Sequence, residues 1–78
     1  MTNIEKYTNA FTETFKISAD EAASLKYQDI PAWDSVGHMS LIAALEEAFD
    51  IMMDTDDIID FSSYEIGKGI LEKYEIHF

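Results

Sequence analysis

Three stretches of apolar residues at helical spacing, each preceded by a helix-capping residue, dominate this chain of 78 residues. In the first stretch Thr2 and Glu5 have the spacing of a capping box, in which each side chain bonds a free backbone amide at the start of a helix. The apolar residues that follow recur every three or four positions: Ile4, Tyr7, Phe11 and Phe15. This spacing predicts a first helix with one buried face.

A second helix is predicted to begin at Ser35, because the carboxylate of Asp34 can accept free amides at the positive end of the helix dipole. Its apolar residues between positions 36 and 49 form a broader stripe than those of the first helix. Before it, Ser18 and Glu21 predict one helical turn, and a long loop follows. The apolar side chains of that loop are expected to pack back onto the core: Leu25, Tyr27 and Ile30.

The last third of the chain predicts a short helix and a longer one. Residues 56–60 form the short helix, with acidic residues at its favourable N-terminal end. Ser62 or Ser63 caps the last helix, and Gly67 and Gly69 in it are expected to permit a close crossing. Its inner face is expected to contain Ile66, Ile70, Leu71 and Tyr74. The predicted fold is a single all-α domain over residues 1–78, a small bundle of three main helices plus one short helix, with a long loop between helices one and two.

Charge and cysteine content restrict the functions open to the chain. Sixteen acidic residues against five basic ones give a net charge of −11, which repels nucleic acid and favours protein partners with basic patches. The charge is equally consistent with a role in solubility alone. Without cysteine the chain has no disulfide, no Cys-based zinc site and no thiol of its own. It also lacks a signal-peptide layout and an apolar run of roughly 20 residues, so we expect a cytoplasmic protein without a membrane span.

The most informative stretch is residues 33–49, with the sequence WDSVGHMSLIAALEEAF. It resembles the acyl carrier protein family, in which an Asp-Ser-Leu or Asp-Ser-Val tripeptide opens the second helix and a Leu-x-x-x-Leu-Glu-x-x-Phe pattern follows. The chain matches this pattern at Leu41, Leu45, Glu46 and Phe49. The resemblance covers essentially the whole chain and implies an acyl-carrier-protein-like bundle.

The resemblance implies that Ser35 is the attachment point of a covalent 4′-phosphopantetheine arm and not a catalytic nucleophile, in a protein that is not itself an enzyme. The region around the arm would then comprise Asp34, Val36, Gly37 and His38. The implied partners are a phosphopantetheinyl transferase and acyl-activating, synthase or acyltransferase enzymes with basic docking patches, all meeting a monomeric carrier. The implied partner-binding residues are Val36, Met39, Glu46, Glu47, Asp54, Asp56 and Asp57.

The sequence after Ser35 departs from that of the best-known fatty-acid carriers at Gly37 and His38. Gly37 replaces an acidic residue that partner enzymes of the family use for docking, which points away from housekeeping fatty-acid synthesis and toward a dedicated pathway. His38 lies three residues after Ser35 on the same helix face. It is either a base toward Ser35 or a histidine that packs on Trp33. The lack of a Gly-x-Ser-x-Gly turn and the small size of the domain favour packing.

Residues 54–57 suggest a calcium loop at first sight. An EF-hand loop that starts at Asp54 needs an oxygen ligand and a glycine at its fifth and sixth positions, where this chain has Ile58 and Ile59. No metal site is therefore predicted. The sequence leaves two alternatives to a carrier, namely an unmodified acidic helical interaction domain and a small hydrolase that uses Ser35 and His38.

Overall fold

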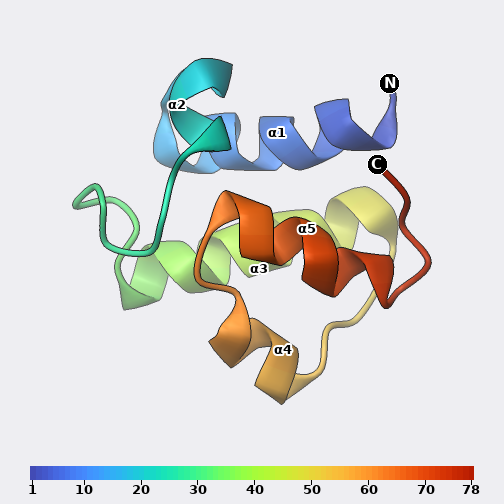
Figure 1. Cartoon of the computed structure of the whole chain (residues 1–78). Coiled ribbons are helices and arrows are strands. Elements are labelled where there is room, and N and C mark those ends of the chain that lie inside the picture. The colour runs from blue at the N-terminus through green and yellow to red at the C-terminus, as the bar shows by residue number, and fades with distance from the viewer.

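The computed structural model describes residues 1–78 and contains five helices and no strand, which confirms the predicted all-α fold. The helices are α1 (Asn3–Phe15), α2 (Ala19–Ala23), α3 (Ser35–Phe49), α4 (Thr55–Asp60) and α5 (Tyr64–Glu72). In Figure 1, α1 lies above α3 and α5, α2 folds back beside α1, and α4 forms the opposite edge. The two ends of the chain lie on the same side of the molecule, where the side-chain amide of Asn3 donates to the His77 carbonyl at 3.0 Å.

The predicted caps are present at the starts of the helices. Thr2 and Glu5 form a complete capping box before α1, and Ser18 and Glu21 form a second one before α2. Hydrogen bonds from Thr2 hold the pKa of Glu5 below its usual range. The helical turn predicted after Ser18 is thus a helix of five residues.

The core is a cluster of sixteen buried apolar side chains in which aromatic rings are prominent. Trp33 is completely buried, and its ring centroid lies 5.6 Å from that of Phe11 and 5.3 Å from that of Phe15. Tyr7 contacts Phe11 edge-on at 5.1 Å. Because each large aromatic ring removes much apolar surface from water, this cluster supplies a major part of the stability of so small a domain.

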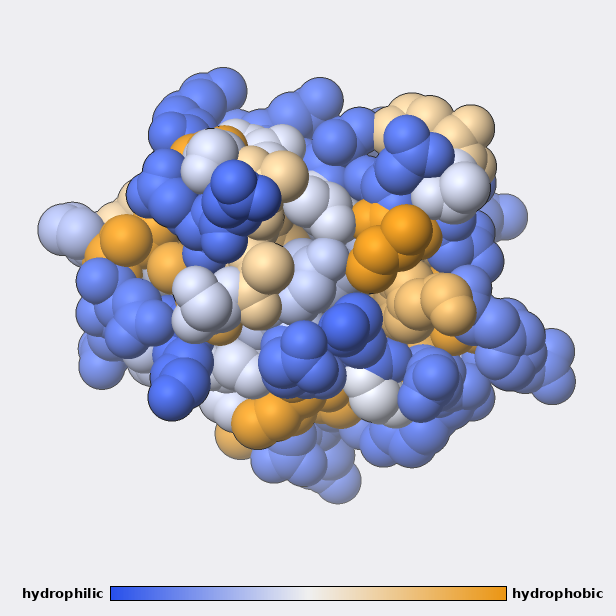
Figure 2. Space-filling model, turned by 45° about the horizontal axis from the view of Figure 1, so that its top comes forward, coloured by the Kyte–Doolittle hydropathy of each residue, from blue (hydrophilic) through white to orange (hydrophobic).

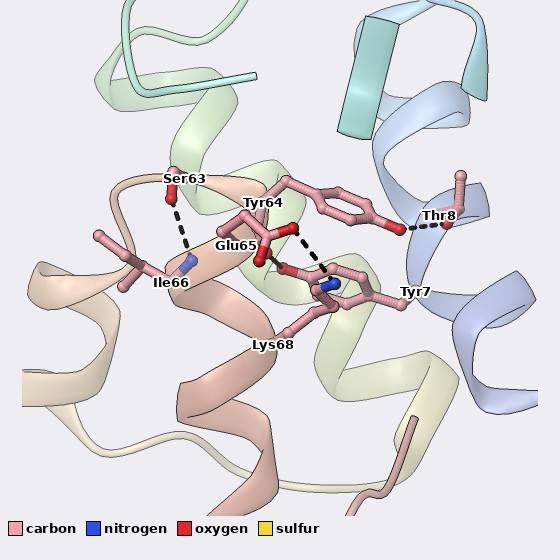
Figure 3. A network of polar contacts seen from close by, with 7 residues as sticks. All are labelled: Tyr7, Thr8, Ser63, Tyr64, Glu65, Ile66 and Lys68. Atoms are coloured by element: carbon pink, nitrogen blue, oxygen red, sulfur yellow. Dashed lines mark hydrogen bonds and ion pairs between the residues drawn. The ribbon is translucent and has the colours of Figure 1, made fainter. Parts of the chain in front are cut away.

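Polar contacts join α1 to the start of α5 (Figure 3). The buried hydroxyl of Tyr7 donates to the Tyr64 carbonyl at 2.7 Å, and the Tyr64 hydroxyl lies 2.7 Å from Thr8 Oγ1. Burial raises the pKa of Tyr7 well above its usual range, so its phenol remains a donor. Ser63 Oγ caps α5 by accepting the Ile66 amide at 3.0 Å.

The loop of residues 24–34 is held against the segment before α5 by main-chain hydrogen bonds. The Tyr27 amide donates to the Ser62 carbonyl at 2.9 Å, and the Tyr64 amide donates to the Leu25 carbonyl at 3.0 Å. Leu25 is buried and Ile30 half-buried, as predicted. The expectation that Tyr27 joins the core is wrong, because its side chain reaches the surface near Ser35.

The predicted inner faces of α1 and α5 are each wrong at one position. Ile4 in the first turn of α1 is exposed, and Ala10 is buried in that helix instead. Ile66 is exposed because α5 turns Tyr64 and Gly67 toward the core, and a residue two positions from Tyr64 points to another side of the helix.

The two glycines of α5 differ in their surroundings. A Cβ atom on Gly67 would lie 2.2 Å from the Phe61 ring and 2.3 Å from the Tyr7 hydroxyl oxygen. A Cβ atom on Gly69 would meet nothing within 4 Å. Gly67 thus leaves room for two side chains that press on α5, whereas the crossing of a second helix predicted at Gly67 and Gly69 is found at neither position.

The surface in Figure 2 is largely hydrophilic, with separate hydrophobic patches between the polar side chains. Nine large hydrophobic side chains are exposed, and three of them lie around the start of α3 and in α4. None of the helices combines the length and the apolar character that a membrane crossing requires.

Candidate functional site

Ser35 is the first residue of α3, and its side chain is exposed. Its hydroxyl lies 3.4 Å from the Tyr27 hydroxyl. Asp34 caps the helix as predicted, because its carboxylate accepts the Gly37 amide at 2.8 Å. The amides of Ser35 and Val36 lie before the first intrahelical bond, so the start of α3 keeps free donors and the positive end of the helix dipole beside the serine.

At Gly37 the loop of residues 24–34 lies directly against α3. A Cβ atom at this position would lie 1.9 Å from the Ala32 carbonyl oxygen and 3.3 Å from the Phe15 ring. Any larger side chain would push the loop away from the helix. This explains in physical terms why the chain has no acidic residue here, and it gives Gly37 a packing role next to Ser35.

A pocket of about 350 Å³ opens directly beside Ser35. Its lining comes from the loop, α3, α4 and the segment before α5, and consists of Tyr27, Ser35, His38, Met39, Ile58, Ile59, Phe61 and Ser62. Of these residues, the sequence identified only Ser35, His38 and Met39 as site residues. Tyr27 and Ser62 enter the pocket because the main chains of their two segments pair, and no local sequence signal reports that pairing.

Apolar side chains stand exposed around the serine. Val36 is 76% exposed, Met39 53% and Ile59 72%, and we call these three residues the apolar rim. Met39 and Ile59 also line the pocket, whereas Val36 follows Ser35 in the helix. Exposed apolar groups gathered around one polar residue are typical of a surface that binds another molecule.

His38 is engaged at both ring nitrogens. Its Nδ1 accepts the indole N–H of Trp33 at 3.0 Å, and its Nε2 lies 2.7 Å from the Ile58 carbonyl oxygen. The His38 and Trp33 rings are nearly parallel, with an interplanar angle of 14°. The predicted packing on Trp33 is confirmed. The alternative role of a base toward Ser35 does not match the geometry, because the hydrogen-bond partner of the Ser35 hydroxyl is Tyr27.

The predicted acidic recognition residues fall into two groups. Glu47, Asp54 and Asp56 are exposed, as a docking role requires. Glu46 is half-buried, and one of its carboxylate oxygens accepts the Met53 amide at 3.0 Å. Glu46 therefore holds the connection between α3 and α4 in addition to contributing charge.

The prediction that Asp57 faces a partner is wrong. Asp57 is only 7% exposed, and its carboxylate accepts hydrogen bonds of 2.5 Å from Lys73 Nζ and from the Tyr74 hydroxyl. The hydrogen bond from Lys73, and then that from Tyr74, lowers the pKa of Asp57, and the bond to Asp57 raises the pKa of Lys73. This group of three residues fastens α4 to the segment just after α5.

No three acidic or histidine side chains are gathered in a way that could hold a metal ion. Comparison with protein-family models, with curated proteins and with solved structures finds no match to this chain. The site consists of an exposed serine at a helix start, an open pocket beside it, an apolar rim and exposed carboxylates on the neighbouring elements.

Proposed function

We propose that this chain is an acyl carrier protein that carries acyl groups as thioesters on a 4′-phosphopantetheine arm attached to Ser35. The observation that carries the proposal is the exposed Ser35 hydroxyl on the first turn of α3, at the mouth of a pocket of about 350 Å³. A modifying enzyme can reach this hydroxyl without unfolding the bundle. The resemblance of residues 33–49 to the acyl carrier protein family supports the same assignment.

The surroundings of Ser35 suit a phosphodiester. The start of a helix favours negative charge, and the Ser35 and Val36 amides are not used within the helix. Asp34 already satisfies the Gly37 amide, so the added phosphate does not have to cap the helix. The Tyr27 hydroxyl lies 3.4 Å from Ser35 Oγ and can donate a hydrogen bond to an oxygen of the attached phosphate. When bound, the arm supplies the thiol that this cysteine-free chain lacks.

Loading requires a separate enzyme. A bond forms between Ser35 Oγ and the phosphorus next to pantetheine in coenzyme A, the pyrophosphate bond breaks, and the nucleotide part of coenzyme A leaves. The proton of the serine hydroxyl passes to the transferase, because both ring nitrogens of His38 are occupied within this protein. In this account the chain holds and presents the arm and catalyses no step itself.

Two features of the surface indicate how partners dock. The apolar rim offers a contact that excludes water, while Glu47, Asp54 and Asp56 offer exposed negative charge on α3 and near the start of α4. Basic patches on a transferase, an acyl-activating enzyme, a synthase or an acyltransferase would complement this surface and speed the encounter. We propose a cytoplasmic monomer that meets these enzymes one at a time.

Incubation with coenzyme A and a promiscuous phosphopantetheinyl transferase, followed by intact-mass measurement, tests the proposal. We expect the wild type to gain the mass of one phosphopantetheine group. Ser35→Ala should gain nothing, and Ser40→Ala should gain as much as the wild type because Ser40 is an exposed serine further along the same helix. No gain in the wild type would favour an acidic interaction domain that works without an arm.

A further inference from the structure

His38 is held in one chemical form by its two partners. An indole N–H can only donate, so the Nδ1 atom that lies 3.0 Å from Trp33 Nε1 must be an acceptor without a proton. A carbonyl oxygen can only accept, so the Nε2 atom that lies 2.7 Å from the Ile58 oxygen must carry the proton. The imidazole is therefore neutral, with its single proton on Nε2.

These two bonds connect the parts that form the pocket beside Ser35. Trp33 belongs to the loop of residues 24–34, His38 to α3 and Ile58 to α4. The His38–Ile58 contact is the one hydrogen bond between α3 and α4, and it satisfies a carbonyl in the last turn of α4. The His38 ring also packs edge-on against Tyr27 at 5.5 Å and against Phe61 at 6.2 Å.

We propose that His38 is a positioning residue that in its neutral form holds α4 against α3 beside the pocket at Ser35, and that it releases α4 when it takes up a second proton. A protonated ring would direct an Nδ1–H at the Trp33 N–H, which places two donors face to face. Trp33 is completely buried and cannot swing aside, so the imidazole must move and leave Ile58. We call the Trp33–His38–Ile58 chain of hydrogen bonds the histidine latch.

The other contacts of α4 determine which way it moves after release. Asp57 remains bound to Lys73 and Tyr74, so α4 stays fastened at the C-terminal end of α5 while its contact with α3 loosens. Because Met39 of α3 and Ile58 and Ile59 of α4 line the same pocket, separation of the two helices would widen it. If the proposed function holds, the pH would determine how closely this pocket surrounds the arm on Ser35.

No charged group pairs with His38, so protonation of the imidazole itself would control the release of α4. The imidazole makes no ion pair, and Tyr27 is the titratable side chain in ring contact with it. The carboxylates of the elements packed against it are otherwise engaged or exposed: Asp34 bonds the Gly37 amide, Asp57 bonds Lys73 and Tyr74, and Asp56 and Asp60 of α4 are exposed.

Nuclear magnetic resonance of the unmodified protein between pH 8 and pH 5 tests the latch. The chain has one tryptophan, so its indole N–H gives one signal that reports directly on the latch. We expect this signal and the ring nitrogens of His38 to change together as the pH falls. His38→Gln keeps one acceptor and one donor but takes up no proton, so its Trp33 signal should stay constant. His77→Gln removes the other histidine and should leave the wild-type change in place.

Hydrogen exchange measures the release of α4. The amides of Ile58 and Phe61 are hydrogen-bonded within the α4 region, and at pH 7 they should exchange about tenfold faster in His38→Leu than in His38→Gln. If His38→Leu does not fold, the proposal is tested by the pH dependence of the Trp33 signal in the wild type and in His38→Gln. A Trp33 signal that stays constant while His38 takes up a proton, or that changes identically in His38→Gln, would overturn the proposal. Neither measurement needs an arm, so failure of Ser35 to accept one leaves this test intact.

Discussion

The two ends of the bundle differ in how completely they are packed. Around Tyr7 and Tyr64, the rings are buried and the hydroxyls are hydrogen-bonded between α1 and α5 (Figure 3). Around Ser35, the side chains of the apolar rim are exposed and a pocket stands open. Apolar groups in water contribute little to folding, so the difference shows that one end supplies stability and the other is available for binding.

The largest expected loss of stability comes from removal of a buried side chain of α3. Leu45 is completely buried, and Leu45→Ala should lower the free energy of unfolding by about 2 to 5 kcal/mol, as measured by urea denaturation. Met39→Ala removes a side chain of similar size from the apolar rim on the same helix and should cost less than about 0.5 kcal/mol. Equal losses in the two variants would contradict the division between the ends.

Gly37→Ala should have the next largest effect. The new Cβ atom would overlap the Ala32 carbonyl oxygen, so the loop must shift, and we expect a loss of about 1 to 3 kcal/mol in denaturation experiments. Gly69→Ala is the matched control, because that position is open and alanine favours a helix. It should stabilise the protein by about 1 kcal/mol. A Gly37→Ala protein as stable as the wild type would show that the loop does not press on α3.

The Asp57 contact with Lys73 should make stability depend on pH. Because the pKa of Asp57 is lowered in the folded protein, its contribution is present at neutral pH and is lost as the pH falls below about 4. Asp57→Asn should therefore lower the melting temperature at pH 7, and its difference from wild type should shrink in acid. Asp56→Asn removes the same charge from an exposed position in the first turn of α4, and at pH 7 it should lower the melting temperature less than Asp57→Asn does.

Ser35→Ala should have the smallest effect on stability. The change lies at an exposed helix start, and Asp34 continues to cap α3. The free energy of unfolding derived from the melting temperature should change by no more than about 1 kcal/mol. Loading by the transferase should be abolished. A large loss of stability would mean that the serine serves the fold and not the arm.

Local chemistry could be predicted from the sequence because the interacting groups lie within a few residues of one another. The capping boxes at Thr2 and Ser18, and the start of α3 at Ser35, are of this kind. The spacing of apolar residues predicted the helices but not the exact inner face. In α5 the face depends on how Tyr64 meets α1, which no residue near Ile66 reports.

The parts of the site that the sequence did not predict depend on contacts between distant segments. Tyr27 reaches Ser35 because its backbone pairs with Ser62, thirty-five residues further along the chain. Asp57 looked like its neighbour Asp56, and the positions of Lys73 and Tyr74 distinguish them in the folded protein. Identity and spacing alone do not contain this information.

The most direct test is the state of Ser35 in protein purified from the cells that make it. Trypsin should cleave after Lys26 and Lys68 and release residues 27–68, which contain four serines. Fragmentation of this peptide should locate one phosphopantetheine group, with or without an acyl thioester, on Ser35 and none on the other three serines. A peptide with an unmodified Ser35, from cells whose other carrier proteins are loaded, would contradict the proposed function.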